Sequence, residues 1–303
     1  IIKPSESTPE TSELVFDMVK ELFEENEVTV IEGDKEVAKQ LLEKPFNHIF
    51  FTGSDKIGRK VLKASSGNLS SITLELGGKS PSIVMPSADV RNISVEMHMR
   101  WARNGGQGCA ALARLLVHES RYDEFLDAGA EAFDQMVVGD PWDPATNVGP
   151  MIRPDHRASV EGFISEALEV GGTKLLEVEK PVPDKGYFVN PVLIGDLPHS
   201  ARAVQEEIFG PVAVILPFST TEQAIEMANG TAFGLAANIW SEDAHEARHM
   251  AERIRAGTVW INGGGGMRGD APFGGYGRSG IGRQLGEWGV REYLEVKHIQ
   301  WRI

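Results

Sequence analysis

The sequence predicts an α/β protein built on parallel β-sheets. Short apolar segments alternate with longer amphipathic ones along the chain, an order typical of repeated β-α-β units. Within the short segments the apolar residues are continuous, which indicates strands that are buried on both faces, as in a parallel sheet. With 303 residues, the chain is long enough for two domains that each have a hydrophobic core.

The first part of the chain, up to residue 76, contains three expected helices and three expected strands. Thr8 and Pro9 mark the first helix start, because threonine caps helices and proline fits the first helical turn. The expected elements are a helix at 9–23, a strand at 28–31, a helix at 34–43, a strand at 48–52, a helix at 55–64 and a strand at 71–76. This order predicts one parallel sheet.

After Gly78 a second α/β pattern begins, interrupted by a Pro/Gly-rich surface loop at 139–151. The expected helices cover 94–101, 122–136, 154–170, 221–229 and 244–254, and the expected strands cover 114–118, 192–194, 212–218, 235–240 and 258–262. A glycine-rich loop at 263–282 and an extended segment at 296–303 complete the chain.

Composition restricts the classes of partner. The chain has 30 Lys and Arg against 44 Asp and Glu, a formal charge of −14, which argues against nucleic acid or an anionic membrane as the main partner. One cysteine excludes an internal disulfide and fits a reducing compartment. No apolar run approaches the ~20 residues of a membrane-spanning helix. We therefore expect a soluble, cytoplasmic protein without nucleic-acid or membrane partners.

The segment from Thr73 to Arg114 holds the strongest candidates for chemistry. Cys109 is flanked by small residues that leave its thiol open to a reactant, and a thiolate is a strong nucleophile. Glu75 ends an apolar strand, where burial raises a carboxyl pKa and suits it to proton transfer. A small buried cysteine beside an ordinary strand-end glutamate explains the same residues. The residues alone leave both interpretations open.

Two further patterns in the sequence are candidates for binding sites. Gly53 and Ser54 lie between an expected strand and an expected helix, where free N–H groups can bind a phosphate, although such turns are common. His245-Glu246-Ala247-Arg248-His249 matches the HExxH pattern of zinc hydrolases. The helix around it is polar on most faces and no third ligand stands out, so a zinc hydrolase is a remote alternative and no metal site is expected.

Four motifs in order, TLELGGKSP, NGGQGC, EEIFGPV and PFGGYGRSGIGR, together with KPSE and FTGS, resemble those of the aldehyde dehydrogenase superfamily. The resemblance covers residues 1 to 303. It implies a partial Rossmann-like cofactor domain, an α/β catalytic domain and a C-terminal arm strand. The implied division is 1–76 for the second half of the NAD-binding domain, 77–276 for the catalytic domain, and 277–303 for a return segment with an oligomerisation arm.

The resemblance also implies a reaction, the oxidation of an aldehyde to a carboxylic acid. Cys109 would attack the aldehyde carbonyl to give a thiohemiacetal, and hydride transfer to the nicotinamide would leave a thioester. Glu75 would be the base that activates Cys109 or the hydrolytic water. Covalent catalysis of this kind splits a difficult oxidation into two easier steps.

The implied cofactor is NAD, with NADP possible, because a carboxylate that binds ribose hydroxyls repels a 2′-phosphate. The residues implied to bind it are Lys3 and Glu6 at the adenine-side ribose, Gly53 and Ser54 at the pyrophosphate, Leu76 beside the nicotinamide, and Glu207 and Phe209 at the nicotinamide-side ribose.

One departure from the family pattern concerns the segment before KPSE. Family members carry about 150 further residues there, roughly one domain, with half of the cofactor sheet and an Asn that donates to the oxyanion. Loss of one such donor costs ~10²–10³ in rate. We therefore expect a fragment that oxidises its small-molecule aldehyde weakly alone, and a homo-oligomer for the intact protein. A non-catalytic relative with an assembly or binding role is the alternative, and the aldehyde stays unassigned.

Overall fold

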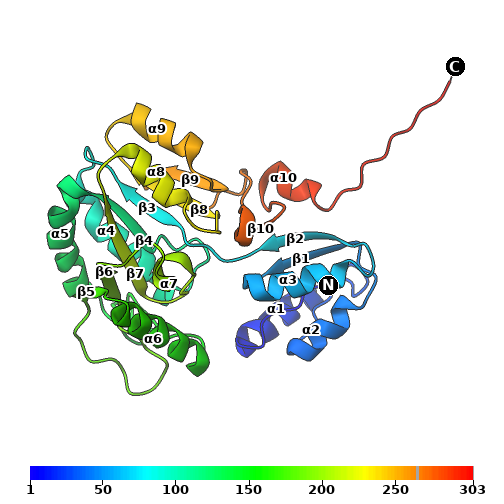
Figure 1. The fold of residues 1–303 in the computed structure, drawn as a ribbon. Coiled ribbons are helices and arrows are strands. Elements are labelled where there is room, and N and C mark those ends of the chain that lie inside the picture. The colour runs from blue at the N-terminus through cyan, green and yellow to red at the C-terminus, as the bar shows by residue number, and fades with distance from the viewer. Residues whose placement is uncertain (264–265, 303) are drawn as a thin grey trace.

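The computed structural model describes residues 1–263 and 266–302 and contains two β-sheets. Gly264 and Gly265 of the predicted glycine-rich loop, and Ile303 at the end of the predicted extended segment, lie outside the described residues. A three-stranded sheet has the order β1-β2-β10, and a seven-stranded sheet has the order β5-β6-β7-β4-β3-β8-β9. Figure 1 shows the small sheet with α1 to α3 on one side of the molecule and the large sheet on the other.

The small sheet contains the elements predicted before residue 76. They are α1 (Pro9–Leu22), α2 (Lys35–Leu42), β1 (His48–Thr52), α3 (Asp55–Ser65) and β2 (Ser71–Glu75). β1 and β2 are parallel, as predicted, and β10 (Gly280–Ile281) returns from far along the chain to pair antiparallel with the end of β2. Glu75 therefore ends the central strand of this sheet.

The prediction of a strand at 28–31 was wrong. Among the described residues this segment makes a single parallel bridge, between Val30 and Ile2. Beyond it the chain passes through Gly33, at a positive φ of 146°, into the cap of α2 at Asp34. An apolar run becomes a strand only where a neighbouring segment pairs with it over several residues, and here only one residue lies opposite.

The large sheet is parallel except at β5, which pairs antiparallel with β6. Its strands are β3 (Pro81–Val84), β4 (Arg114–His118), β5 (Thr173–Glu177), β6 (Val192–Gly195), β7 (Val212–Phe218), β8 (Ala236–Trp240) and β9 (Thr258–Ile261). The helices beside it are α4 (Val90–Ala102), α5 (Tyr122–Gln135), α6 (Pro154–Glu169), α7 (Arg202–Gln205), α8 (Thr221–Asn229) and α9 (Ala244–Arg253).

Both faces of the large sheet are covered, whereas β1 of the small sheet, for which burial on both faces was predicted, is half-exposed. Neighbouring residues point to opposite faces: Leu116 packs in one cluster and Leu115 and Val117 in the other. Buried side chains of α6 to α9 complete the first cluster, and buried side chains of α4 and α5 complete the second.

Several elements went unpredicted, namely β3, β5, β10, α7 and a short helix α10 (Gly286–Arg291). α4 begins at Val90, four residues before the predicted start at Ser94, because the Asp89 side chain accepts from the backbone N–H of Asn92 and caps the helix earlier. Residues 294–302 form neither helix nor strand and run away from both sheets (Figure 1). In the described part of the chain, no helix combines the length and apolarity needed to cross a bilayer.

Candidate active site

The predicted motifs meet where the chain passes from β2 to β3, at two glycines that allow close contact. A Cβ atom on Gly77 would lie 2.0 Å from Oε2 of Glu207, and one on Gly78 would lie 2.6 Å from the carbonyl oxygen of Cys109. Any side chain at these positions would collide with its neighbour. The two glycines therefore let the Glu207 carboxylate and the Cys109 backbone approach the end of β2 together.

A third close contact at a glycine, which together with those at Gly77 and Gly78 we call the glycine crossings, joins the loop before Cys109 to the segment before β7. A Cβ atom on Gly106 would lie 2.0 Å from the carbonyl oxygen of Gly210, and Gly106 itself has a φ of 70° that favours glycine. Between these segments is a small hollow of about 20 Å³, lined by residues of all three motifs: Gly78, Lys79, Gly106, Gly108, Ala111, Ala113, Glu207, Ile208, Phe209, Gly210 and Val212. Residues 77–79, 106–111 and 207–210 thus form one site.

Glu75 is buried at the edge of this site, with 3% of its surface exposed. Neither carboxylate oxygen has a hydrogen-bond partner within the described residues. Burial raises the pKa of Glu75 to about 7, and the positive charge of Arg283 opposes that rise. A carboxyl group with a pKa near neutrality can both accept and return a proton, as a general base requires.

Cys109 is half-buried, and its thiol is the single one in the sequence. Burial raises the pKa of the thiol, and the negative charges of Glu207 and Glu75 raise it further, while a backbone hydrogen bond at Ala110 lowers it. The thiol is therefore protonated at neutral pH and needs a base to become a nucleophile. Glu75 and Glu207, whose charges raise the pKa of the thiol, are the carboxylates that act on it electrostatically.

Glu207 is the second carboxyl group with a strongly raised pKa. Burial raises the pKa of Glu207 to about 7, against a hydrogen bond from the backbone N–H of Gly78 (3.1 Å to Oε1) and the positive charge of Lys79. Lys79 is itself buried, and burial lowers its pKa to about 7. Buried ionisable groups gathered around a hollow are typical of functional sites.

The predicted phosphate turn lies beside Glu75. The backbone N–H of Gly53 donates to the carbonyl oxygen of Glu75 (3.1 Å), which ties the end of β1 to the end of β2. Ser54 occupies the cap position of α3, yet its side chain makes no capping hydrogen bond. Its hydroxyl and the first N–H groups of α3 are thus available to an anion such as a pyrophosphate, so this turn fits a dinucleotide.

The other residues predicted to bind the cofactor are spread around the site. Lys3 and Glu6 form an ion pair (3.5 Å). Leu76 packs against Gly58 of α3, in the small core with Val61. Phe209 has a φ of 56°, and its carbonyl oxygen is 2.7 Å from Nε2 of His156. Their roles toward a cofactor stay predictions.

The HExxH residues lie on α9, and two of them have partners of another kind. Oε1 of Glu246 accepts a hydrogen bond from the hydroxyl of Thr221 (2.9 Å), and Nε2 of His249 is 3.0 Å from Nη1 of Arg253. Within residues 1–263 and 266–302, no group of three His, Cys, Asp or Glu side chains has the spacing of a metal site. The arrangement is that of a solvated helix face.

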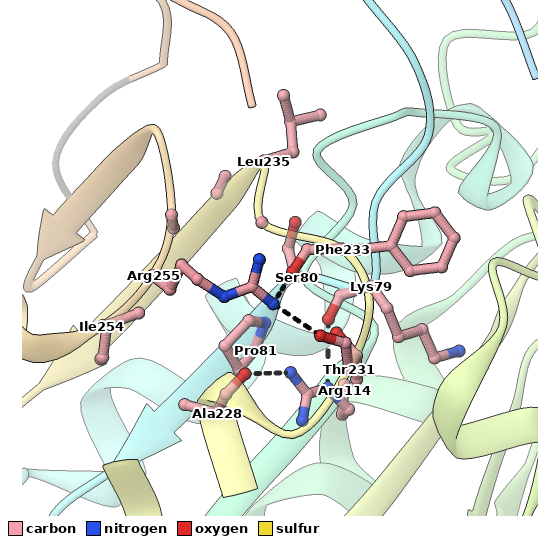
Figure 2. A pocket seen from close by; sticks show the side chains of 13 residues that line it. Lys79, Ser80, Pro81, Arg114, Ala228, Thr231, Phe233, Leu235, Ile254 and Arg255 are labelled. Carbon is pink, nitrogen blue, oxygen red and sulfur yellow. Dashed lines mark hydrogen bonds between the residues drawn. The ribbon is translucent and has the colours of Figure 1, made fainter. Parts of the chain in front are cut away.

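Sequence reasoning missed two arginines that hold the end of α8 and the loop between α8 and β8. Arg114 is fully buried and donates to the carbonyl oxygens of Lys79 (3.1 Å) and Ala228 (2.8 Å), and Arg255 donates to that of Thr231 (2.7 Å). Figure 2 shows both guanidinium groups facing this loop while the Lys79 side chain leads away. A buried arginine gives no local signal in a sequence.

Sequence and structure comparisons agree on one family. The family described as "Aldehyde dehydrogenase family" matches residues 1–299. Betaine aldehyde dehydrogenase of Bacillus subtilis is 38% identical over 99% of this chain and 62% of its own length, and mitochondrial aldehyde dehydrogenase of Homo sapiens is 37% identical over 100% and 59%.

Among solved structures, betaine aldehyde dehydrogenase of Staphylococcus aureus in complex with NAD⁺ superposes with a TM-score of 0.93. It is 36% identical and covers 98% of this chain and 60% of its own. A Mycobacterium tuberculosis aldehyde dehydrogenase complexed with NAD⁺ gives a TM-score of 0.91 at 36% identity, over 96% and 60%. The chain therefore spans about three fifths of the length of its relatives.

Proposed function

This chain belongs to the aldehyde dehydrogenase family, and on that premise we propose that it serves in the NAD-dependent oxidation of an aldehyde to a carboxylic acid. The observation that carries the proposal is the meeting of Cys109, Glu75 and Glu207 at the glycines that follow β2. One nucleophile and a carboxylate with a pKa near 7 are the groups that covalent oxidation of a carbonyl needs.

The chemistry starts with the thiol. Glu75 takes the proton of Cys109, and the thiolate attacks the aldehyde carbon to form a thiohemiacetal. NAD, when bound, supplies the acceptor for the hydride that this carbon loses in becoming a thioester. Glu75 releases the proton of Cys109 to the solvent and then removes a proton from the water that hydrolyses the thioester. That second proton passes to the departing sulfur, which frees the acid and the thiol. Burial without a hydrogen bond, which keeps the pKa of Glu75 near 7, suits it to both proton transfers.

The same premise extends to the dinucleotide. We assign residues 1–76 to the cofactor-binding part, 77–276 to the catalytic part and 277–303 to the return segment and arm. Gly53 and Ser54 would hold the pyrophosphate, Lys3 and Glu6 the adenine-side ribose, Glu207 and Phe209 the other ribose, with Leu76 beside the nicotinamide. The free cap hydroxyl of Ser54 and the buried Glu207 carboxylate support this assignment. The relatives' structures contain NAD⁺.

We also propose that the 303-residue chain oxidises aldehydes slowly by itself and that the protein acts in the cytoplasm. We propose further that the intact protein assembles with copies of itself. The exposed apolar side chains of Leu14, Met18 and Leu22 on α1 and of Phe50 on β1 support the assembly. Apolar side chains gathered on one part of a molecule are usually covered by further protein surface.

The proposed role of Cys109 is tested with Cys109→Ser. We expect the purified chain to bind NADH and to form NADH from NAD⁺ and an aldehyde, and we expect the variant to lose about 10⁴-fold or more in rate while it keeps its NADH affinity. NADH fluorescence and absorbance measure both. An unchanged rate in Cys109→Ser would contradict the proposal. A wild-type chain that binds NADH but shows no thiol-dependent oxidation would favour the non-catalytic alternative.

A further inference from the structure

A three-residue ionic network links parts of the chain that are far apart in sequence. Nε of Arg278 donates to Oδ2 of Asp55 (2.8 Å), and its Nη1 and Nη2 donate to the two carboxylate oxygens of Glu206 (2.9 and 3.1 Å). The side chains are 29%, 21% and 38% exposed, respectively. Bidentate geometry and partial burial make such contacts stronger than ordinary surface ion pairs.

Arg278 also contacts the loop between α8 and β8 through its guanidinium group and its backbone. Its Cζ lies 4.7 Å from the centre of the Phe233 ring, and the backbone N–H of Arg278 donates to the carbonyl oxygen of Ala232 (3.0 Å). Phe233 belongs to the loop between α8 and β8, in which the carbonyl oxygens of Thr231 and Phe233 accept from Arg255 (Figure 2). The position of Arg278 is therefore set by the large sheet.

Both acidic partners adjoin residues of the proposed dinucleotide site. Asp55 is the first residue of α3 and directly follows Ser54, while Glu206 directly precedes Glu207. An aspartate in the first turn stabilises a helix, yet its charge repels a phosphate at the same helix end. The other cation near Asp55, Arg59, has its Nε 3.8 Å from Oδ2 and is 70% exposed, so it offsets this charge weakly.

We propose that Arg278 is a positioning residue for the dinucleotide: it neutralises Asp55 beside the phosphate turn and ties that turn to the segment that carries Glu207. The inference rests on the proposed function, because it takes residues 53 and 54 as the pyrophosphate contact. It assigns to Arg278 no contact with the dinucleotide. One guanidinium group thus makes an acidic helix start compatible with an anionic ligand and sets its spacing from the ribose carboxylate.

The test measures NADH affinity of the full chain by fluorescence titration in Arg278→Gln, Arg278→Lys and the double variant Asp55→Asn/Arg278→Gln. We expect Arg278→Gln to weaken binding about tenfold, a loss of about 1.4 kcal/mol. Arg278→Lys keeps the charge without the bidentate geometry and should lose less. The double variant should recover part of the loss, because the unpaired carboxylate is gone. Arg253→Gln, which breaks an ion pair with Glu222 between α8 and α9, is the matched control and should bind as wild type.

A second readout needs no cofactor. Hydrogen exchange of the unliganded chain should be faster in residues 51–58 and 206–210 of Arg278→Gln than in those of Arg253→Gln. If the wild-type chain fails to bind NADH, the proposed function fails for this chain, and the tie made by Arg278 is judged by exchange alone. Wild-type NADH affinity in Arg278→Gln would overturn the inference. So would a loss that the double variant does not relieve, or exchange equal to that of the control.

Discussion

The large and small sheets differ in how completely their side chains are buried. Strands β4 and β7 of the large sheet are almost entirely buried between two layers of helices, whereas β1 of the small sheet is half-exposed. The fully buried apolar core of the small sheet consists of Val61, Leu74 and Leu76. The part that holds Cys109 is therefore stabilised by its own packing, and the part that holds Gly53 and Ser54 depends more on links to its surroundings.

This difference matters because the site draws on both parts. Cys109 and Glu207 come from loops at the edge of the large sheet, while Glu75 and Ser54 come from strand ends of the small sheet. The return segment joins the two: β10 pairs with β2, and Ser279 accepts from the backbone N–H of Leu76 (3.0 Å). The distances between site residues of the two parts therefore depend on the rigidity of the contacts between the return segment and β2.

The largest expected effect compares the two cores directly. Leu116→Ala creates a cavity in the fully covered large sheet and should lower the free energy of unfolding by about 4 kcal/mol. Leu74→Ala lies in a smaller core that can relax to fill the cavity, so it should lower the free energy of unfolding by about 2 kcal/mol. Four of the six tryptophans lie between residues 101 and 260 and two lie in the return segment, so fluorescence reports mainly the large part and circular dichroism reports both. Urea titrations with equal losses would show that the small core is as tightly packed as the large one.

A second prediction concerns pH and the two buried carboxyl groups. The folded state raises the pKa of Glu75 from 4.5 to about 7, so it binds this proton more tightly than the unfolded state does. Stability from Glu75 is therefore fully present below about pH 4.5 and is lost as the pH rises to about 7, an effect of about 3 kcal/mol. Glu75→Gln should remove this loss and exceed the wild type in stability at pH 8.

The matched variant for this prediction is Glu207→Gln in the large part. The pKa of Glu207 also rises from 4.5 to about 7, a value that already includes the hydrogen bond from the N–H of Gly78, so Glu207→Gln should show a pH-dependent gain of similar size. Urea midpoints of the wild type and both variants, measured in a series of buffers from about pH 4 to about pH 8, would test these pH-dependent gains in stability. Parallel profiles for Glu75→Gln and the wild type would contradict the assignment.

The smallest expected effect compares two helix caps. The Thr220 side chain accepts from the backbone N–H of Gln223 (3.2 Å) at the start of α8, so Thr220→Ala should cost about 1 kcal/mol of stability. Ser54 makes no such bond at the start of α3, so Ser54→Ala should leave stability nearly unchanged and weaken NADH binding instead. A stability loss in Ser54→Ala that matches the Thr220 variant would show that its hydroxyl serves the helix.

Sequence predicted the elements whose signals are local. Apolar runs such as 114–118 and 212–218 became strands, and Thr8 and Pro9 marked the start of α1. β3 escaped because it has four residues and begins at Pro81, and β10 because its two residues are extended only through pairing with β2. The run at 28–31 had a strand composition but no partner along its length.

For the site, motif order singled out Cys109, Glu75 and Glu207. The structure brings Glu207 to Gly77 and the Cys109 backbone to Gly78, the two residues that follow Leu76 at the end of β2, close to Glu75. The links that hold the site together had no local signal. Arg278 stands 223 residues from Asp55 and 72 from Glu206 along the chain. An isolated arginine within a glycine-rich segment resembles any exposed cation. Only the folded chain shows which carboxylates lie near it.

The glycine crossings at Gly77, Gly78 and Gly106 also bear on the order of folding. Each one brings together segments that are separated by tens of residues or more, so the entropy lost in closing those loops precedes any gain from the contacts. Strand pairs and helices with nearer partners can form earlier, and contacts of high sequence separation form slowly. Cys109, Glu75 and Glu207 therefore come together among the last events of folding, and the recovery of NADH binding after refolding would time the completion of the whole chain.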